Sequence, residues 1–409
     1  MAEVLPFNGL LPRPDMAPQV AAVPYDVVNS EEAAVLAEGN QYSFLRVSRP
    51  EIEMEPGIDL HCDAVYEKAA ANFKRLCQEA PLVVDSEKHL YIYRLQMGAH
   101  VQTGIVGAVS AEEYRKDIIK KHEKTRKDKE DDRTRHVMTL RSHTGPAFLT
   151  YRDDREINRF IEQLTIEKPY FDFTAADGIV HTLWRIGAAE SEKLSGMFKR
   201  VPCLYIADGH HRSAAAARTA AECAPLNKDH NGSEDYNYFL AVTFPQSQLK
   251  ILPYNRAVKT LNGLSKNEFF KKVELHFSIL PTKEQMPNNP GEFCMYIGGE
   301  WFLIRPKFDP AARSVIARLD VSVLQDDILA PILGIDDPRT STGIDFIGGI
   351  RGPGELIKLV DSGRYAVAFS MYPTTLEQLM DIADAGEIMP PKSTWFEPKL
   401  RDGVVCHNF

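Results

Sequence analysis

The sequence lacks several features that would assign it to a class at once. It has no run of about 18 apolar residues, so we expect no membrane-spanning helix. Six cysteines are few for 409 residues, and none form a Cys-x-x-Cys pair, which excludes a zinc knuckle and a disulfide-dense fold. Lysine and arginine (48) are outnumbered by aspartate and glutamate (57). The resulting net charge of −9 argues against a dedicated nucleic-acid binder.

The N-terminus also lacks the basic region and apolar core of a secretory signal. What the chain does have is the composition of a folded protein, with 44% hydrophobic and 26% charged residues. We therefore expect a cytoplasmic protein, present as a monomer or a homodimer, with no membrane partner and no nucleic-acid partner.

Apolar strand-like runs alternate with amphipathic helical patterns, which predicts a mixed α/β fold in two parts. The first part is expected to cover residues 1–252, with a charged helical segment inserted near 111–141. The second, a C-terminal αβ region over 253–409, is expected to pack on the first. The clearest elements are a helix at 59–78, a hairpin of 90–95 with 101–106, and strands at 201–207 and 238–245.

The most informative segment is an apolar strand that runs through Asp208-Gly209 directly into an alanine-rich helix. The first N–H groups of a helix lack intrahelical partners and carry partial positive charge, so this geometry predicts an anion site, commonly for phosphate. Gly209 allows close backbone approach, and Arg212 adds a permanent charge. His210 and His211 can donate hydrogen bonds. Asp208 stands where a Mg²⁺ ligand or a general base would be needed.

Two other interpretations of this segment remain open from the residues alone. Asp-Gly is a common turn, and a carboxylate before a helix often caps it. Two adjacent histidines flanked by an aspartate also suggest a metal site, although adjacent side chains rarely converge on one ion.

The run Ala207-Asp208-Gly209-His210-His211-Arg212, followed by small residues, resembles the signature of the ParB/sulfiredoxin-like superfamily. Members of that superfamily place a Gly-x-x-Arg turn at a helix start against nucleotide phosphates. The form with Asp-Gly-His-His-Arg is most similar to the free serine kinases of the group, which phosphorylate the hydroxyl of the amino acid itself. Partition proteins carry Gly-Glu-Arg-Arg there and sulfiredoxins carry a cysteine, and this sequence has neither.

A second resemblance covers almost the whole chain. Together with the histidine turn, five segments resemble one family long catalogued only as a domain of unknown function: Val23–Val27, Tyr42–Leu45, Lys121–Thr125, Ile344–Gly349 and Met389–Phe396. Its place in the superfamily implies a nucleotide-binding core. The activity that it implies is serine kinase activity, with Mg²⁺ and ATP (or ADP as donor) as cofactors and an amino acid as substrate.

The segment Arg115–Arg141 contains eleven lysines or arginines and has a net positive charge. A positive region in an acidic protein can attract a nucleoside triphosphate, although a solvated helix face with i,i+4 ion pairs would have the same composition. Within it, the resemblance places Lys121, His122 and Thr125 near the nucleotide and makes Glu123 a candidate catalytic residue.

The remaining candidates concern the acceptor. Tyr25 and Asp26 are expected near the phosphate turn, where Asp26 could orient the substrate ammonium group or act as base. His143 and Thr144 belong to a hydroxyl-rich segment suited to binding a carboxylate. Arg351 follows a glycine cluster that resembles a phosphate-cradling loop, which is a weak signal by itself.

The sequence thus predicts an ATP-dependent small-molecule kinase that converts free L-serine to O-phosphoserine. The alternative is a nucleotide-hydrolysing binding switch of the ParB-like type. A histidine-bound metal hydrolase would require a third ligand, which no spacing supplies.

Overall fold

The computed structural model describes residues 1–79 and 81–409, which divide into two compact units. Unit 1 comprises Met1–Leu249 and Pro398–Phe409, and unit 2 comprises Lys250–Glu397. The sequence placed the boundary close by, at 252/253, but its C-terminal region 253–409 differs from unit 2 at the end. The segment Pro398–Phe409, here called the return segment, belongs to unit 1 because its strand pairs with an N-terminal strand there.

The main sheet of unit 1 has eight strands and is mixed, which confirms the predicted α/β class. Only β10 with β5 and β11 with β7 pair in parallel among its described strands. The predicted hairpin is present as β3 and β4, and β11 has the predicted bounds. In spatial order the strands are β5 (Ile119–Lys120), β10 (Leu204–Asp208), β7 (Ala147–Tyr151), β11 (Tyr238–Pro245), β4 (His100–Ser110), β3 (Tyr91–Met97), β9 (Val180–Arg185) and β8 (Phe171–Thr174).

A second, four-stranded sheet of unit 1 holds the return segment. Its antiparallel order is β2 (Leu82–Val84), β1 (Gly9–Pro12), β20 (Cys406–Asn408) and β6 (Ser142–His143). The return segment therefore lies directly beside the segment that contains His143.

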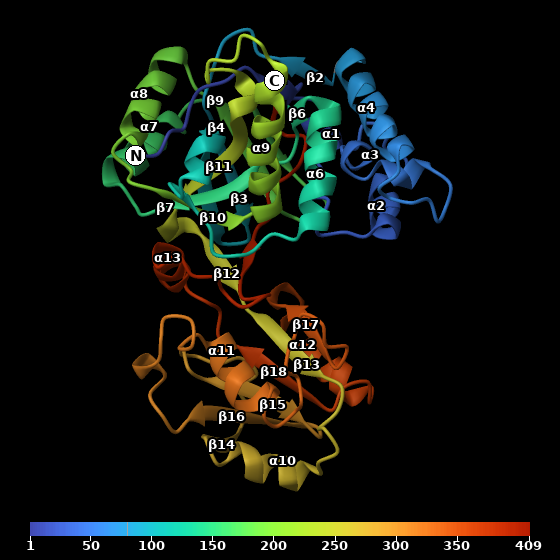
Figure 1. The fold of residues 1–409 in the computed structure, drawn as a ribbon, viewed down its shortest axis with the longest axis vertical. Helices are drawn as coiled ribbons and strands as arrows, with labels where there is room; N and C mark the ends of the chain where they lie inside the picture. The colour runs from blue at the N-terminus through green and yellow to red at the C-terminus, as the bar shows by residue number, and fades with distance from the viewer. Residues whose placement is uncertain (80) are drawn as a thin grey trace. The chain divides into compact units, whose positions relative to one another are not determined.

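Helices of unit 1 cover the main sheet, and α9 and α6 pack against each other (Figure 1). Small side chains on α9, such as Ala214 to Ala217, are buried and allow this close approach. The described α-helices are α1 (Ala17–Val20), α2 (Ser30–Ala37), α3 (Leu45–Ser48), α4 (Asp63–Gln78), α5 (Ala111–Arg115), α6 (Lys127–Leu140), α7 (Arg155–Leu164), α8 (Ala188–Phe198) and α9 (His210–Cys223).

The charged segment near 111–141 is not one helix, and that prediction is wrong. α5 ends at Arg115, and Asp117 then adopts a left-handed φ of 55°, which stops the helix. Ile119 is fully buried and pairs with Leu204 in β10, so tertiary pairing overrides the local helical pattern. α6 begins only at Lys127.

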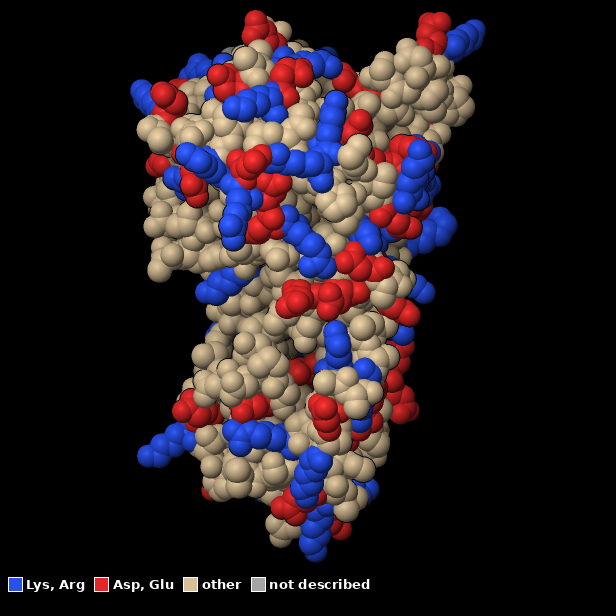
Figure 2. Space-filling view, turned by 90° about the vertical axis from the view of Figure 1, so that its left-hand side faces the viewer, with Lys and Arg blue, Asp and Glu red and all other residues tan. Residues whose placement is uncertain are grey.

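Acidic neighbours compensate much of the positive charge of this segment. The pairs are Arg126 with Asp128, Lys127 with Asp131 and Arg133 with Asp132, each at 2.7 Å. The interpretation as a helix face with ion pairs therefore describes α6 better than an open basic surface does. On the face of the molecule that Figure 2 shows, lysine and arginine are likewise interspersed with aspartate and glutamate.

Unit 2 contains a six-stranded antiparallel sheet and a separate two-stranded ribbon. The sheet order is β14 (Phe277–Thr282), β16 (Glu300–Pro306), β15 (Phe293–Ile297), β18 (Val367–Met371), β13 (Tyr254–Val258) and β17 (Ile344–Gly348), and the ribbon is β12 (Lys250–Leu252) with β19 (Trp395–Glu397). Its α-helices are α10 (Lys266–Val273), α11 (Asp320–Leu324), α12 (Gly352–Asp361) and α13 (Leu376–Asp384). Among the described residues of both units, no helix has the length and apolar character needed to cross a membrane.

Candidate functional site

Gly209 alone separates the end of β10 at Asp208 from the start of α9 at His210. Its φ of 91° and ψ of 32° lie in the left-handed region, which glycine adopts without the penalty of a Cβ. The N–H of Ser213 donates to the carbonyl of Gly209 at 2.9 Å and closes the first turn. The three preceding N–H groups, of residues 210–212, are therefore the unpaired donors expected of a helix start. The predicted strand, turn and helix are confirmed.

Gly209→Ala is expected to lower the free energy of unfolding by about 1–2 kcal/mol, because alanine is strained in the left-handed region. Its Cβ would lie 3.4 Å from the Cα of Ala147, which is an ordinary contact, so the expected loss comes from the backbone strain. Chemical denaturation measures the effect. Gly196→Ala in α8 is the matched control, since its Cβ would meet nothing within 4 Å, and it is expected to be neutral or stabilising. An unchanged stability of Gly209→Ala would contradict the described turn.

Asp208 is held in place by two donors. Its Oδ1 accepts a hydrogen bond from the N–H of Gly209, and its Oδ2 accepts one from Lys399 Nζ, both at 2.7 Å. Burial raises the pKa of Asp208, but Lys399 and Arg212 outweigh it and hold the pKa well below its usual range. The two donors hold the ionised carboxylate in one orientation, so Asp208 can anchor the turn while each oxygen keeps a further lone pair for a ligand.

His122 and His210 lie edge to face beside the helix start, with ring centroids 4.4 Å apart. Both side chains are buried, and three of their ring nitrogens have no hydrogen-bond partner of ordinary geometry among the described residues: both of His122 and Nε2 of His210. Burial lowers the pKa of His122 to about 4, and burial together with His122 lowers the pKa of His210. Neutral, buried imidazoles without partners indicate a place where water or a ligand completes the hydrogen bonding.

These buried histidines predict a pH-dependent stability. The pKa of an unfolded imidazole is about 6.5, whereas burial lowers the pKa of His122 to about 4, so the unfolded state binds more protons between these values. The free energy of unfolding should therefore fall as the pH drops from 6.5 to 4, by up to about 1.4 kcal/mol per pH unit for each such group. Denaturation at several pH values between 6.5 and 4 measures this change in the free energy of unfolding. His122→Gln should reduce the dependence by the contribution of one such group, whereas exposed His276→Gln should leave it unchanged.

The loop before α6 brings further predicted residues to α9. Glu123, half-exposed, lies with Oε2 3.8 Å from His210 Nδ1. His211 accepts a hydrogen bond at Nε2 from the N–H of Arg126 at 3.1 Å. Thr125 donates to Glu130 at 3.2 Å, within the same part of the loop. Lys121 differs, because its ammonium group donates to the Tyr114 carbonyl and pairs with Asp117, so it binds back to the α5 end of the segment.

Arg212 is the positive centre of the site. Its Nη1 donates to the Pro146 carbonyl at 2.6 Å, and its Nη2 donates to Asp26 Oδ2 at 3.2 Å. Burial lowers the pKa of Arg212, but three carboxylates, those of Asp26, Asp208 and Asp402, outweigh it and raise the pKa. Arg212 therefore contributes to the charge balance of three carboxylates, one of which, Asp208, also pairs with Lys399.

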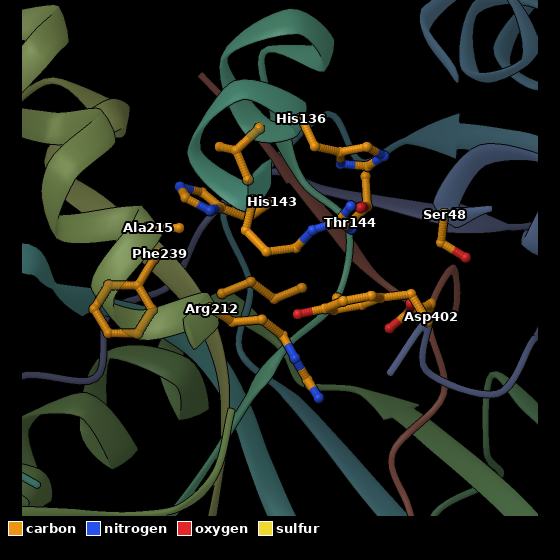
Figure 3. A pocket seen from close by; sticks show the side chains of 13 residues that line it. Ser48, His136, His143, Thr144, Arg212, Ala215, Phe239 and Asp402 are labelled. Atoms are coloured by element: carbon orange, nitrogen blue, oxygen red, sulfur yellow. The ribbon is translucent and has the colours of Figure 1, made fainter. Parts of the chain in front are cut away.

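A cavity of about 30 Å³, lined by both polar and apolar residues, adjoins Arg212. Figure 3 shows Arg212, Thr144, Ser48 and Asp402 grouped around it. Three of the predicted acceptor residues line it: Tyr25, His143 and Thr144. Arg351 is not among the lining residues and lies in unit 2, in the 3-10 turn Gly349–Arg351.

Other lining residues were not anticipated from the sequence, chiefly Ser48, Arg133, His136 and Asp402. Arg133 and His136 stand on the inner side of α6, where the helical period of that segment could have identified them. Asp402 belongs to no recognisable motif.

The return segment places three charged side chains in unit 1. Lys399 holds Asp208, as described above. Arg401 donates to His181 Nε2 at 3.2 Å and pairs with Asp177. Asp402 is fixed by backbone hydrogen bonds to Ala22 in both directions, at 2.9 and 3.1 Å. The C-terminal end of the chain is therefore part of the site.

The arrangement defines an α/β protein in which a helix start with unpaired N–H groups lies beside a cavity lined by Arg212. The chain belongs to the family described as "Protein of unknown function (DUF1015)", whose model matches residues 4–322, and this confirms the predicted resemblance to a family of unknown function. No curated protein matches the chain. Among the described residues, no cluster of three or more His, Cys, Asp or Glu side chains is arranged to hold a metal ion.

Several solved structures resemble the chain at low identity. One is a free serine kinase in complex with AMP, at 13% identity and a TM-score of 0.35, covering 72% of this chain and 86% of that one. Another is SbnI with a C-terminal truncation from Staphylococcus aureus, at 10% identity and a TM-score of 0.39, covering 73% and 85%. A conserved hypothetical protein from Pyrococcus furiosus matches at 13% identity and 0.35, covering 73% and 93%. TM-scores below 0.5 support no functional conclusion by themselves.

Proposed function

We propose that the protein is an ATP-dependent small-molecule kinase that phosphorylates free L-serine to O-phospho-L-serine, on a core of the ParB/sulfiredoxin-like type. The observation that carries this proposal is the position of Arg212, which stands in the first turn of α9 and also lines the cavity. A phosphate at the helix start and an acceptor in the cavity would both contact one guanidinium. Phosphoryl transfer requires this kind of positioning and charge neutralisation above all.

The nucleotide phosphates are proposed to bind the N–H groups of residues 210–212. The buried His122 and His210 would supply neutral hydrogen-bond donors beside them, and Glu123 would orient His210 through its Nδ1. Asp208 keeps the turn in shape, held by Lys399. Each oxygen of Asp208 keeps a further lone pair, so its carboxylate could also contact Mg²⁺, the role that the sequence predicts for it. Mg²⁺ bound to the phosphates would add charge neutralisation.

Asp26 is the proposed general base. It pairs with Arg212, its side chain is 38% exposed, and Tyr25 next to it lines the cavity. These contacts support a position within reach of both proposed subsites. The serine hydroxyl oxygen would form a bond to the γ-phosphorus while the bond from that phosphorus to the β,γ-bridging oxygen breaks. The hydroxyl proton would pass to Asp26, and ADP would leave.

The test is incubation of the protein with Mg²⁺, ATP or ADP and a panel of hydroxylated amino acids and metabolites, scored by product mass. The proposal predicts a gain of one phosphoryl group on serine, with stoichiometric loss from the nucleotide. Consumption of the nucleotide without a phosphorylated acceptor would contradict it and favour a nucleotide-hydrolysing switch. Phosphorylation of another acceptor only would refute serine as the substrate.

A further inference from the structure

Three buried polar atoms without a hydrogen-bond partner belong to residues that line the cavity: Nε of Arg212, Oδ1 of Asp402 and Nε2 of His143. Such atoms are uncommon in folded proteins, and here one cavity brings a cationic donor and a carboxylate oxygen together. The cavity of about 30 Å³ has room for roughly two water molecules, or for the polar groups of a small ligand in their place.

Asp402 differs in charge from the other residues that line the cavity. Arg133 is already compensated by Asp132 at 2.7 Å, and its guanidinium lies over the Tyr25 ring at 4.0 Å. Asp402 is the only carboxylate among the described residues that line the cavity. Water can satisfy these atoms, and a ligand that takes the place of water would present a cation to Asp402 and an anion to Arg212, as the ammonium and carboxylate groups of an amino acid do.

We propose that Asp402 receives the α-ammonium group of the acceptor and thereby makes this kinase select amino acids over hydroxy acids with the same carboxylate and hydroxyl groups. The inference rests on the proposed kinase function. It assigns specificity to a residue of the return segment, which lies outside residues 4–322 matched by the family.

Gly145 leaves room for the Asp402 carboxylate on the lining of the cavity. A Cβ at this position would lie 2.7 Å from Asp402 Oδ1, so a side chain here would displace the carboxylate. Gly145 does not adopt a positive φ, and its backbone would accept alanine without strain. The lack of a side chain at Gly145 therefore leaves the space that the Asp402 carboxylate occupies.

The ionisation of Asp402 is expected to control acceptor binding. Burial raises the pKa of Asp402 to about 7, against the opposing effect of Arg212. The other charged or titratable groups near Asp402 are Asp26, which raises its pKa further, Arg133 and His136 on α6, His143 on β6 and Tyr25. Because the ammonium group needs the ionised carboxylate, serine binding should strengthen as the pH rises from 6 to 8. This dependence should be absent for glycerate, which has no ammonium group.

The experiment measures kcat/KM for L-serine and for D,L-glycerate, with wild-type protein and Asp402→Asn. The wild type should prefer serine by about 10²-fold, and the variant should lose most of that preference by losing activity on serine. Gly145→Ala should act in the same direction, whereas Gly196→Ala in α8 is the matched control and should leave both values unchanged. ATP binding by each variant verifies that the nucleotide site remains folded.

A serine preference that survives both substitutions, or a wild type that accepts serine and glycerate equally, would overturn the inference and leave the kinase function intact. A wild type that phosphorylates neither acceptor would refute the proposed function, and this inference with it. If Asp402→Asn does not fold, the pH dependence of the wild type and the Gly145→Ala variant decide.

Discussion

Asp26→Asn is expected to reduce kcat for serine phosphorylation by about 10²–10⁴-fold, the usual contribution of a general base. In the wild-type protein Arg212 donates to Asp26 at 3.2 Å. Asparagine retains an oxygen that can accept this hydrogen bond, so the shape of the site should persist. The amide cannot take the serine proton. The measurement is steady-state kinetics with serine together with a titration of ATP binding, which should change little.

Asp15→Asn is the matched control, because Asp15 also pairs with an arginine, Arg13, at an exposed position. It should leave kcat unchanged. Glu123→Gln tests the rival carboxylate beside His210. If Glu123→Gln reduced kcat more than Asp26→Asn does, the base would be Glu123, and the role given to Asp26 would be wrong.

Arg212→Met is expected to destabilise the protein by about 3–5 kcal/mol, the range for removing one partner from a buried ion pair. Arg212 compensates Asp26, Asp208 and Asp402, and its side chain is only 11% exposed. Methionine would fill the volume but leave three carboxylates without this charge. The same substitution should abolish ATP binding, since the guanidinium is a proposed phosphate contact. Thermal and chemical denaturation and nucleotide titration measure the two effects.

Arg200→Met serves as the control for this second prediction. Arg200 also pairs with two carboxylates, Asp154 and Glu156, but it is 42% exposed. Exposed ion pairs contribute at most about 1 kcal/mol, so this variant should remain near wild-type stability and bind ATP normally. A similar loss of stability in both variants would contradict the central place of Arg212 in the cluster.

The elements that could be predicted from the sequence are those fixed by short-range patterns. The strand, the Asp-Gly turn and α9 follow from an apolar run, a glycine and an alanine-rich stretch that are adjacent in the chain. The prediction for the segment near 111–141 failed because its charge pattern suggests a helix throughout, whereas Ile119 pairs with a strand far away in sequence. Local propensity contains no information about such a partner.

The residues of the candidate site likewise divide into those that short-range patterns predicted and those that they did not. Gly209, His210 and Arg212 come from the motif at the helix start, and the family resemblance led to His122 and Tyr25. The hydroxyl-rich composition of their segment led to His143 and Thr144. Lys399 and Asp402 could not be found, because they reach the site only after the whole of unit 2, and the Lys399–Asp208 contact spans 191 positions. Isolated charged residues near a chain end carry no pattern that distinguishes them from surface residues.

The most direct test of the account is a crystal structure of the protein with Mg²⁺ and a non-hydrolysable ATP analogue. We predict phosphate oxygens within hydrogen-bond distance of the N–H groups of His210, His211 and Arg212, with the terminal phosphate on the side of the cavity that holds Asp402. Phosphates bound elsewhere, with the first turn of α9 left without an anion, would contradict the account.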